Sequence, residues 1–258
     1  LDGDRLPRYF PAIACHLEKT VSLQPGSMGQ FALIDAAESN ARAIPSRSVI
    51  DLTGKMSDDG TLRWDAPEGN WEVIRFGYTT TGKMIRPATA EGKGLEVDKM
   101  DAAAVTHHFN SFPKKLVDAA GGFAGNTFGY FLIDSWEAEY QNWTGNFPHE
   151  FQELRGYSLV PYIPVLCGAV VDGVDESEAF LHDFRKTIAD LIEQNFYRHF
   201  SELCHRHGMK LHSEVIYGDA HSPPIDVLKT NSYIDVPMSE FWATRAGDPM
   251  NDGSPVEY

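Results

Sequence analysis

The chain is poor in cysteine, in basic residues and in long apolar runs, and each shortage excludes a class of protein. Its three cysteines (Cys15, Cys167 and Cys204) cannot all pair, and none has CxxC spacing, so we expect small core residues. No stretch approaches the run of about 18 apolar residues that a membrane helix requires, and no leader pattern is present. The 22 basic against 37 acidic residues give a net charge of −15, which disfavours nucleic acid.

Several catalytic motifs are also missing. The sequence has no GxSxG elbow, no HExxH and no phosphate loop, which removes the common esterase, zinc-protease and nucleotide-binding interpretations. The group Cys204, His205 and His207 resembles a metal cluster, but we expect these residues to end a helix whose dipole favours positive charge. What remains is a globular chain of 258 residues, 42% of them hydrophobic, enough for one large core or two ordinary ones.

The first third of the chain is predicted to be β-rich. From about Ala12 to Tyr78, short apolar runs alternate with the turn sequences SDDG and PEGN. This pattern is typical of an antiparallel meander, whose last strand we expect at Trp71 to Tyr78.

The rest of the chain alternates helical and strand patterns. A helix is expected over residues 101–122, with Asp101 as its N-cap and Pro113 as a kink or boundary. Apolar residues at spacings of three and four predict a long helix from Ser177 to His207, ended by Gly208. The other expected elements are strands at residues 127–137, 209–218 and 232–242 and short helices at 148–155 and 222–231.

This alternation predicts an α/β fold, because the units are long enough for parallel crossovers. Fewer than eight strand and helix pairs are present, so we expect a (β/α) TIM-type barrel that is incomplete in this chain, with an N-terminal antiparallel β-rich segment. Residues 1–78 would contribute to the barrel or be inserted in it, and residues 79–258 would form the barrel part. A doubly wound open sheet is the alternative. Because the sequence starts at Leu1 without methionine, we expect a piece of a longer protein.

Three expected strands end in a glutamate beside an aromatic residue. Glu137 follows FLIDSW, Glu214 follows KLHS, and Glu240 follows DVPMS. In a barrel the loops after the strands converge over one mouth, where catalytic groups stand. Two carboxylates facing each other there can protonate a departing glycosidic oxygen and activate water or attack C1. The pattern therefore indicates glycoside hydrolysis.

Four longer motifs make this interpretation more specific. They are, in order, RFGYTTTGKMIRPATAEGKGLEVDKMD, FLIDSWEAEYQNWT, FRKTIADLIEQNFYRHFSELCHRHGMKLHSE and DVPMSEFW. Together they resemble glycoside hydrolase family 106, whose characterised members are α-L-rhamnosidases. The resemblance implies an interrupted (β/α) barrel with β-rich accessory domains, a single displacement with inversion, and a calcium ion near the sugar hydroxyls.

The resemblance also implies roles for single residues. Glu137 as acid and Glu240 as base would form the catalytic pair, with Glu214 in reserve or as a sugar or calcium ligand. Glu96 and Asp98 are further candidates for calcium, which prefers oxygen ligands. The expected sugar-binding residues are aromatic (Trp136, Trp143, Tyr217 and Trp242) or hydrogen-bonding (Asp134, Asn142 and His212).

The expected function is removal of a terminal α-L-rhamnose from a glycan or glycoside. Two alternatives stay open: a carbohydrate-binding remnant without turnover, and a hydrolase for another sugar such as a β-galactoside or β-glucuronide. The expected partners are a carbohydrate and the remaining domains of a longer chain, with no nucleic acid and no membrane insertion. From the substrate class we expect an extracellular or periplasmic location.

Overall fold

The computed structural model describes residues 36–85, 87–138, 141–215 and 224–239. The chain divides into two compact units, of which unit 1 comprises residues 1–81 and 140–188, and unit 2 comprises residues 82–139 and 189–258. No helix in the described ranges is long and apolar enough to cross a membrane.

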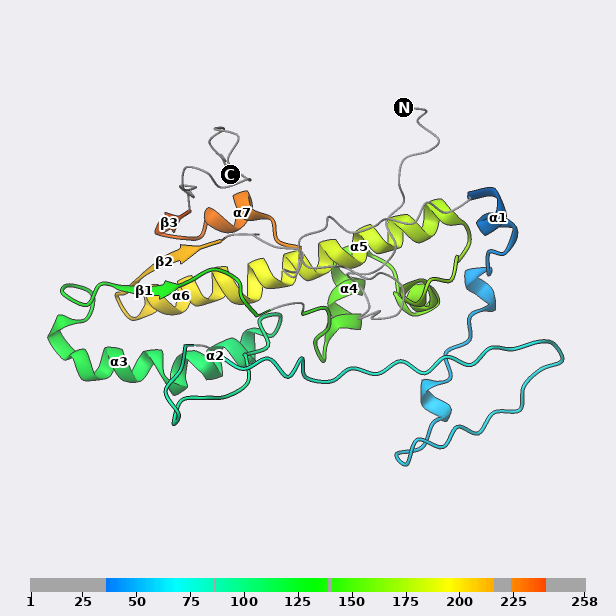
Figure 1. Cartoon of the computed structure of the whole chain (residues 1–258), viewed down its shortest axis with the longest axis horizontal. Coiled ribbons are helices and arrows are strands. Elements are labelled where there is room, and N and C mark those ends of the chain that lie inside the picture. The colour runs from blue at the N-terminus through cyan, green and yellow to red at the C-terminus, as the bar shows by residue number, and fades with distance from the viewer. Residues whose placement is uncertain (1–35, 86, 139–140, 216–223, 240–258) are drawn as a thin grey trace, which may run out of the picture. The chain divides into compact units, whose positions relative to one another are not determined.

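Unit 1 is built from helices around an aromatic core. Its largest buried side chains, Phe147, Phe151, Phe180 and Phe184, come from two helices and lie with ring centroids 4.9–6.0 Å apart. Burial of such rings is the main stabilising term for a core of this kind. The elements are α1 (Ala36–Ala41), the 3₁₀ turns η2 (Ser46–Ser48), η3 (Thr53–Lys55) and η5 (Val160–Cys167), α4 (Phe147–Arg155), and α5 (Val174–Ile192), whose last residues belong to unit 2 (Figure 1).

The predicted antiparallel β-rich segment is wrong for the described residues. Before residue 82 these form one isolated antiparallel bridge, Met56 with Leu62, and no named strand. Residues 71–78 have no assigned strand, and Val73 and Tyr78 there are 58% and 65% exposed. A strand is stabilised by pairing with a neighbour, so an alternating apolar pattern without such a partner stays irregular.

Unit 2 contains a three-stranded parallel sheet in the order β1 (Tyr130–Ile133), β2 (Lys210–Glu214), β3 (Val236–Met238). Phe131 of β1 packs against Phe109 and Phe200, at 6.0 Å and 6.4 Å between ring centroids, so α2 and α6 cover one face of the sheet. On the other face Leu132 is 58% exposed. The helical elements are α2 (Ala102–Ser111), α3 (Pro113–Ala120), η4 (Gly121–Phe123), η6 (Glu193–Arg198), α6 (His199–Arg206) and α7 (Val227–Asn231) (Figure 1).

Helix boundaries in unit 2 follow the predicted local chemistry. The Asp101 carboxylate accepts a hydrogen bond from the Ala103 amide and caps α2, and Pro113 begins α3. The long predicted helix is present as α5, η6 and α6 in succession, with Gly208 beyond its end at φ +71°. Its middle segment, η6, is a π-helical turn, which the apolar periodicity did not predict.

The predicted barrel is also wrong for the described residues, which carry a small parallel sheet within a helix-rich chain. Closing a barrel of this type takes about eight tilted strands, and three strands leave an open sheet. Among the cysteines, Cys204 is buried as expected, whereas Cys167 is exposed, and Cys15 lies outside the described residues.

Candidate active site

The candidate site of unit 2 lies at the carboxyl edge of the sheet. Ile133 of β1 aligns with Ser213 of β2, and Glu214 aligns with Met238 of β3. Because the strands are parallel, the residues that follow them emerge at the same edge. The register thus brings the segment that carries Asp134 and Glu137 alongside the end of β2.

The last residue of β2, Glu214, is 1% exposed. Since side chains alternate along a strand, Glu214 shares a sheet face with His212, which is half-buried and aligned with Leu132. Tyr197 of η6 is also buried, and burial together with the charge of Glu214 raises the pKa of its phenol above the ordinary value. Glu214 and Tyr197 are therefore both buried, and the charge of the acid affects the phenol.

The segment after β1 presents its acids to solvent. Asp134 and Glu137 are both exposed, and Asp134 Oδ1 accepts a hydrogen bond from the Ser135 amide at 2.9 Å. An exposed carboxylate at a strand end can reach a substrate, whereas a buried one acts through a narrow opening or through a neighbour. The two strand-end glutamates of the described residues thus differ sharply in environment.

One face of the Trp136 ring contacts a buried lysine, Lys99. Lys99 Nζ lies 5.0 Å from the Trp136 ring centroid and 2.6 Å from Glu96 Oε2. Trp136 itself is 8% exposed, so the ring face toward Lys99 is closed to a sugar. Stacking of Trp136 on a pyranose stays a prediction that concerns its other face.

The π-helical turn η6 supplies contacts that the sequence patterns did not reveal. Asn195 Nδ2 donates a hydrogen bond to the Met100 carbonyl oxygen at 2.7 Å, and the Phe196 ring lies 5.6 Å from Lys99 Nζ. Tyr197, one residue further, is buried, and the charge of Glu214 contributes to its raised pKa. A π turn adds a residue to one helical turn and so re-aims the side chains around it, which is why such turns recur at functional sites.

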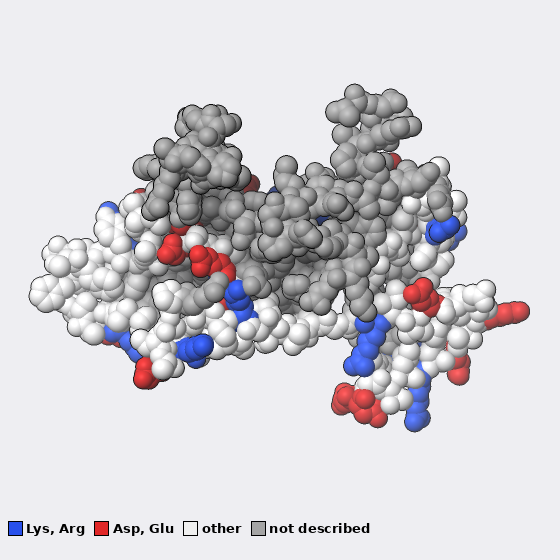
Figure 2. Space-filling view, in the orientation of Figure 1, with Lys and Arg blue, Asp and Glu red and all other residues white. Residues whose placement is uncertain are grey.

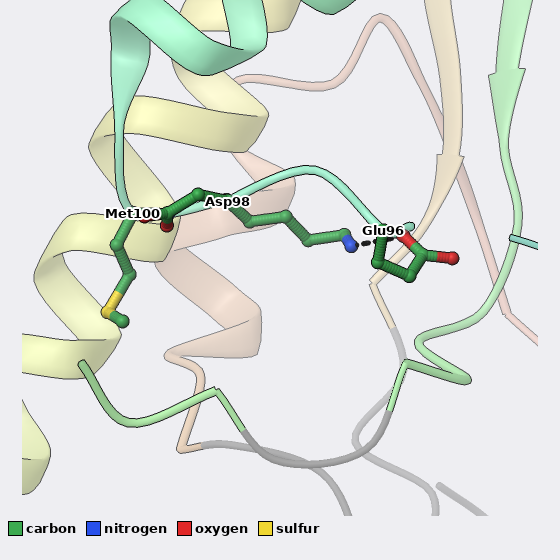
Figure 3. Close-up of polar contacts among 4 residues, drawn as sticks. Glu96, Asp98 and Met100 are labelled. Carbon is green, nitrogen blue, oxygen red and sulfur yellow. Dashed lines mark hydrogen bonds and ion pairs between the residues drawn. The ribbon is translucent and has the colours of Figure 1, made fainter. Parts of the chain in front are cut away.

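Glu96 and Asp98, the candidate calcium ligands, have other partners. Glu96 is paired with the Lys99 ammonium, and Asp98 Oδ1 accepts a hydrogen bond from the Met100 amide at 2.9 Å (Figure 3). A cation already at Glu96 does not fit a calcium ligand set, which takes six to eight oxygens around the ion. In the part of the chain that the structure describes, no three His, Cys, Asp or Glu side chains form a possible metal site.

The two candidate sugar-binding residues of unit 1 lie beside its aromatic core. Trp143 stacks on Phe147 at 5.0 Å between centroids and lies 6.2 Å from Tyr78. Its indole N–H is buried and has no hydrogen-bond partner among the described residues, which is unusual for a tryptophan. Asn142 is half-buried.

Three predicted site residues, Tyr217, Glu240 and Trp242, lie outside the described residues. Glu240 is two positions beyond Met238, the last residue of β3. The predicted catalytic pair of Glu137 and Glu240 therefore stays a prediction.

The histidines at the end of α6 have local partners. His205 Nε2 lies 2.8 Å from Asp235 Oδ2, and the same carboxylate oxygen accepts a hydrogen bond from the Leu211 amide. Burial works against the charge of Asp235, but the Leu211 amide and His205 keep the pKa of Asp235 below its ordinary value. His207 stacks on Phe109 at 5.5 Å between centroids. These residues tie the helix end to the sheet.

Comparison with known proteins adds evidence of another kind. A family model described as alpha-L-rhamnosidase, glycoside hydrolase family 106, matches residues 18–254. A relative from Formosa agariphila, named "Putative beta-glucuronidase", is 42% identical over 209 residues. The solved structure of a rhamnosidase from Novosphingobium sp. PP1Y matches with a TM-score of 0.69 at 29% identity and covers 88% of this chain.

The chain spans 17% of the length of the Formosa agariphila relative and 24% of the solved rhamnosidase chain. The family match nevertheless covers most of the chain, from residue 18 to residue 254. This chain therefore belongs to glycoside hydrolase family 106, the alpha-L-rhamnosidase family.

Proposed function

We propose that the protein is a glycoside hydrolase that removes terminal α-L-rhamnose with inversion, and that this chain supplies its catalytic carboxylates. The observation that carries the proposal is the parallel register, which brings the segment after β1 and the ends of β2 and β3 to one sheet edge. A family 106 chain with glutamates at two such strand ends has the groups that glycosidic cleavage needs.

In the proposed reaction, Glu137 protonates the departing oxygen as the sugar–oxygen bond breaks, and Glu240 removes a proton from the water that attacks C1. Exposed Glu137 can reach a glycoside that approaches the edge. Glu214 and His212, on one sheet face, would hydrogen-bond sugar hydroxyls. Inversion requires carboxylates about 6.5–9.5 Å apart, which leaves room for the water.

The test is turnover of an aryl α-L-rhamnoside by Glu137→Gln, Glu240→Gln and Glu214→Gln variants of the protein. A matched control is Glu202→Gln, which changes an exposed glutamate 3.8 Å from Arg198 on α6. We expect the first two variants to lose at least a thousandfold in kcat, while the control keeps wild-type kcat. Proton NMR of the first product should show an anomeric configuration opposite to that of the substrate. Wild-type turnover in both Glu137→Gln and Glu240→Gln would refute the assignment.

A second candidate is a β-glucuronidase, favoured by the name of the Formosa agariphila relative. A uronate substrate carries a carboxylate that an unpaired cation would bind. Beside Trp136 the cation is Lys99, and its charge is already balanced by Glu96, which favours an uncharged sugar. The ratio of kcat/KM for aryl α-L-rhamnoside and aryl β-D-glucuronide decides between the two, and sugar binding without any turnover would support the non-catalytic alternative.

Calcium dependence and an extracellular or periplasmic location are further proposals, supported by the family and by the class of substrate. Loss of activity on treatment with a chelator, restored by Ca²⁺, would support the first. Because Glu96 already faces Lys99, we expect Glu96→Gln to leave the calcium requirement unchanged.

A further inference from the structure

Lys99, the lysine beside Trp136, is buried, which is energetically unfavourable for a charged group, and its ammonium has specific contacts. Lys99 is 7% exposed, yet its ammonium pairs with the Glu96 carboxylate and lies over the rings of Trp136 and Phe196. Taking an ammonium out of water is unfavourable unless its partners replace the water. A methionine or leucine would fill the same space without that cost.

One of the contacts of Lys99 is with Trp136, the residue next to Glu137. Residues 134–138 have no helix or strand hydrogen bonding of their own, so side-chain contacts decide where this segment lies. A cation over an indole face prefers one ring orientation, and the attraction is strongest when the pair is desolvated, as here. A fixed Trp136 ring in turn limits where the backbone of Glu137 can go.

The chain is fixed by contacts on both sides of Lys99. The Glu96 carboxylate lies three residues before it, on the segment that the Met84 to Leu95 bridge ties down. The Met100 carbonyl, one residue after it, accepts a hydrogen bond from Asn195 of η6. Lys99 therefore lies on a segment that is fixed on both sides, which makes it a rigid support for a neighbouring ring.

We propose that Lys99 is a positioning residue, which holds Trp136 through its ammonium and thereby places the Glu137 carboxylate for proton transfer. The kinetic part of this inference rests on the proposed hydrolase function. The structural part does not, because it concerns only the segment after β1.

The experiment compares Lys99→Met with Lys99→Arg and with Lys114→Met, all in the whole protein. Lys114 forms a similar pair with Asp118, also at 2.6 Å, but both side chains are exposed. In Lys99→Met we expect amide exchange of residues 134–138 to be about tenfold faster and kcat to fall about tenfold, with KM within about twofold. Lys99→Arg should restore most of both, since it keeps the cation, and Lys114→Met should match wild type.

A double-mutant cycle with Trp136→Leu keeps the inference falsifiable if one variant folds poorly. If Lys99 acts through Trp136, Lys99→Met adds little to the exchange rate or to kcat once the ring is gone. Wild-type exchange in Lys99→Met, or fully additive effects in the cycle, would overturn the inference. Absence of turnover by the wild-type protein on every aryl glycoside would instead refute the proposed function, while the exchange measurements still decide the role of Lys99.

Discussion

Lys229 Nζ of α7 lies 2.8 Å from Glu193 Oε2 of the π turn η6. The glutamate is 1% exposed, whereas 47% of the lysine side chain is exposed. The pair links the helix that precedes β3 to the same π turn whose Phe196 ring lies 5.6 Å from Lys99 Nζ. The π turn thus contacts both the helix that leads to β3 and the lysine beside Trp136.

Removing Lys229 should cost more stability than removing Lys114, because it leaves the buried Glu193 charge without this partner, whereas Asp118, the partner of Lys114, is exposed. For Lys229→Met we expect the free energy of unfolding to fall by about 1–3 kcal/mol, less than for a fully buried pair because water screens the lysine. Urea denaturation measures the change, with Lys114→Met as the control at about 0.5 kcal/mol or less. If both variants lost the same free energy of unfolding, the loss of Lys229 as a partner of buried Glu193 would have no measurable cost.

His108 offers a way to detect the charges of Lys99 and Glu96 without any substrate. Burial lowers the pKa of His108, the charge of Lys99 lowers it further, and the charge of Glu96 raises it. We therefore expect Lys99→Met to raise this pKa and Glu96→Gln to lower it, as followed by the imidazole resonances in an NMR titration. An unchanged titration in both variants would mean that the pair lies elsewhere in solution.

The lowered pKa of His108 also has a consequence for stability. The unfolded chain binds this proton more readily than the folded one, so stability falls as the pH drops below the ordinary value of about 6.5 and stops falling below the lowered pKa. A His108→Gln variant, which cannot take up the proton, should lose this part of the pH dependence. Melting temperatures measured between pH 4 and pH 8 provide the comparison with wild type.

Local chemistry explains which parts of the fold could be predicted. Asp101 caps α2, Pro113 begins α3 and Gly208 follows the last helix, because each of these residues acts through its own backbone or its nearest neighbours. The expected strand at residues 71–78 failed because pairing depends on a distant partner that its own pattern cannot supply. The barrel prediction failed for the same reason, because a barrel closes only when all of its strands pair with their neighbours.

In the candidate site, too, features set by local sequence could be predicted and features set by distant residues could not. The glutamate at the end of β2 could be found from a strand pattern that ends in an acid, but its burial could not, since burial depends on residues that are distant in the sequence. Lys99 left no signal, because a lysine between two acids in a loop predicts a solvated side chain. The π turn was hidden because one extra residue leaves apolar spacings of three and four largely intact.

Asp235 should make the protein sensitive to acid. Its pKa is below the ordinary value because the Leu211 amide and His205 stabilise the charged form more than burial opposes it. The stabilisation is therefore present above about pH 4 and is lost as the pH falls through the lowered pKa. Asp235→Asn should cost about 1–2 kcal/mol near pH 6 and little near pH 2, as measured by thermal unfolding. If the stability lost in Asp235→Asn did not depend on pH, the charge of the Asp235 carboxylate would not be the source of the stabilisation.

Gly125 lies so close to Gly208 that a side chain at position 125 should be destabilising. Gly125 has φ +76°, and a Cβ built on it would lie 2.8 Å from the Gly208 carbonyl oxygen, a backbone atom that cannot turn away. The contact lies just before both β1 and β2, so a shift there would change the register that sets the strand ends. We expect Gly125→Ala to lower the free energy of unfolding by about 2–4 kcal/mol, from the left-handed backbone and the clash together. Gly122→Ala is the matched control, since a Cβ at Gly122 would meet nothing within 4 Å and its φ lies outside the left-handed region, so its stability should change by less than about 1 kcal/mol. If Gly125→Ala were as stable as Gly122→Ala, the two chain segments would not approach each other as closely as the structure shows.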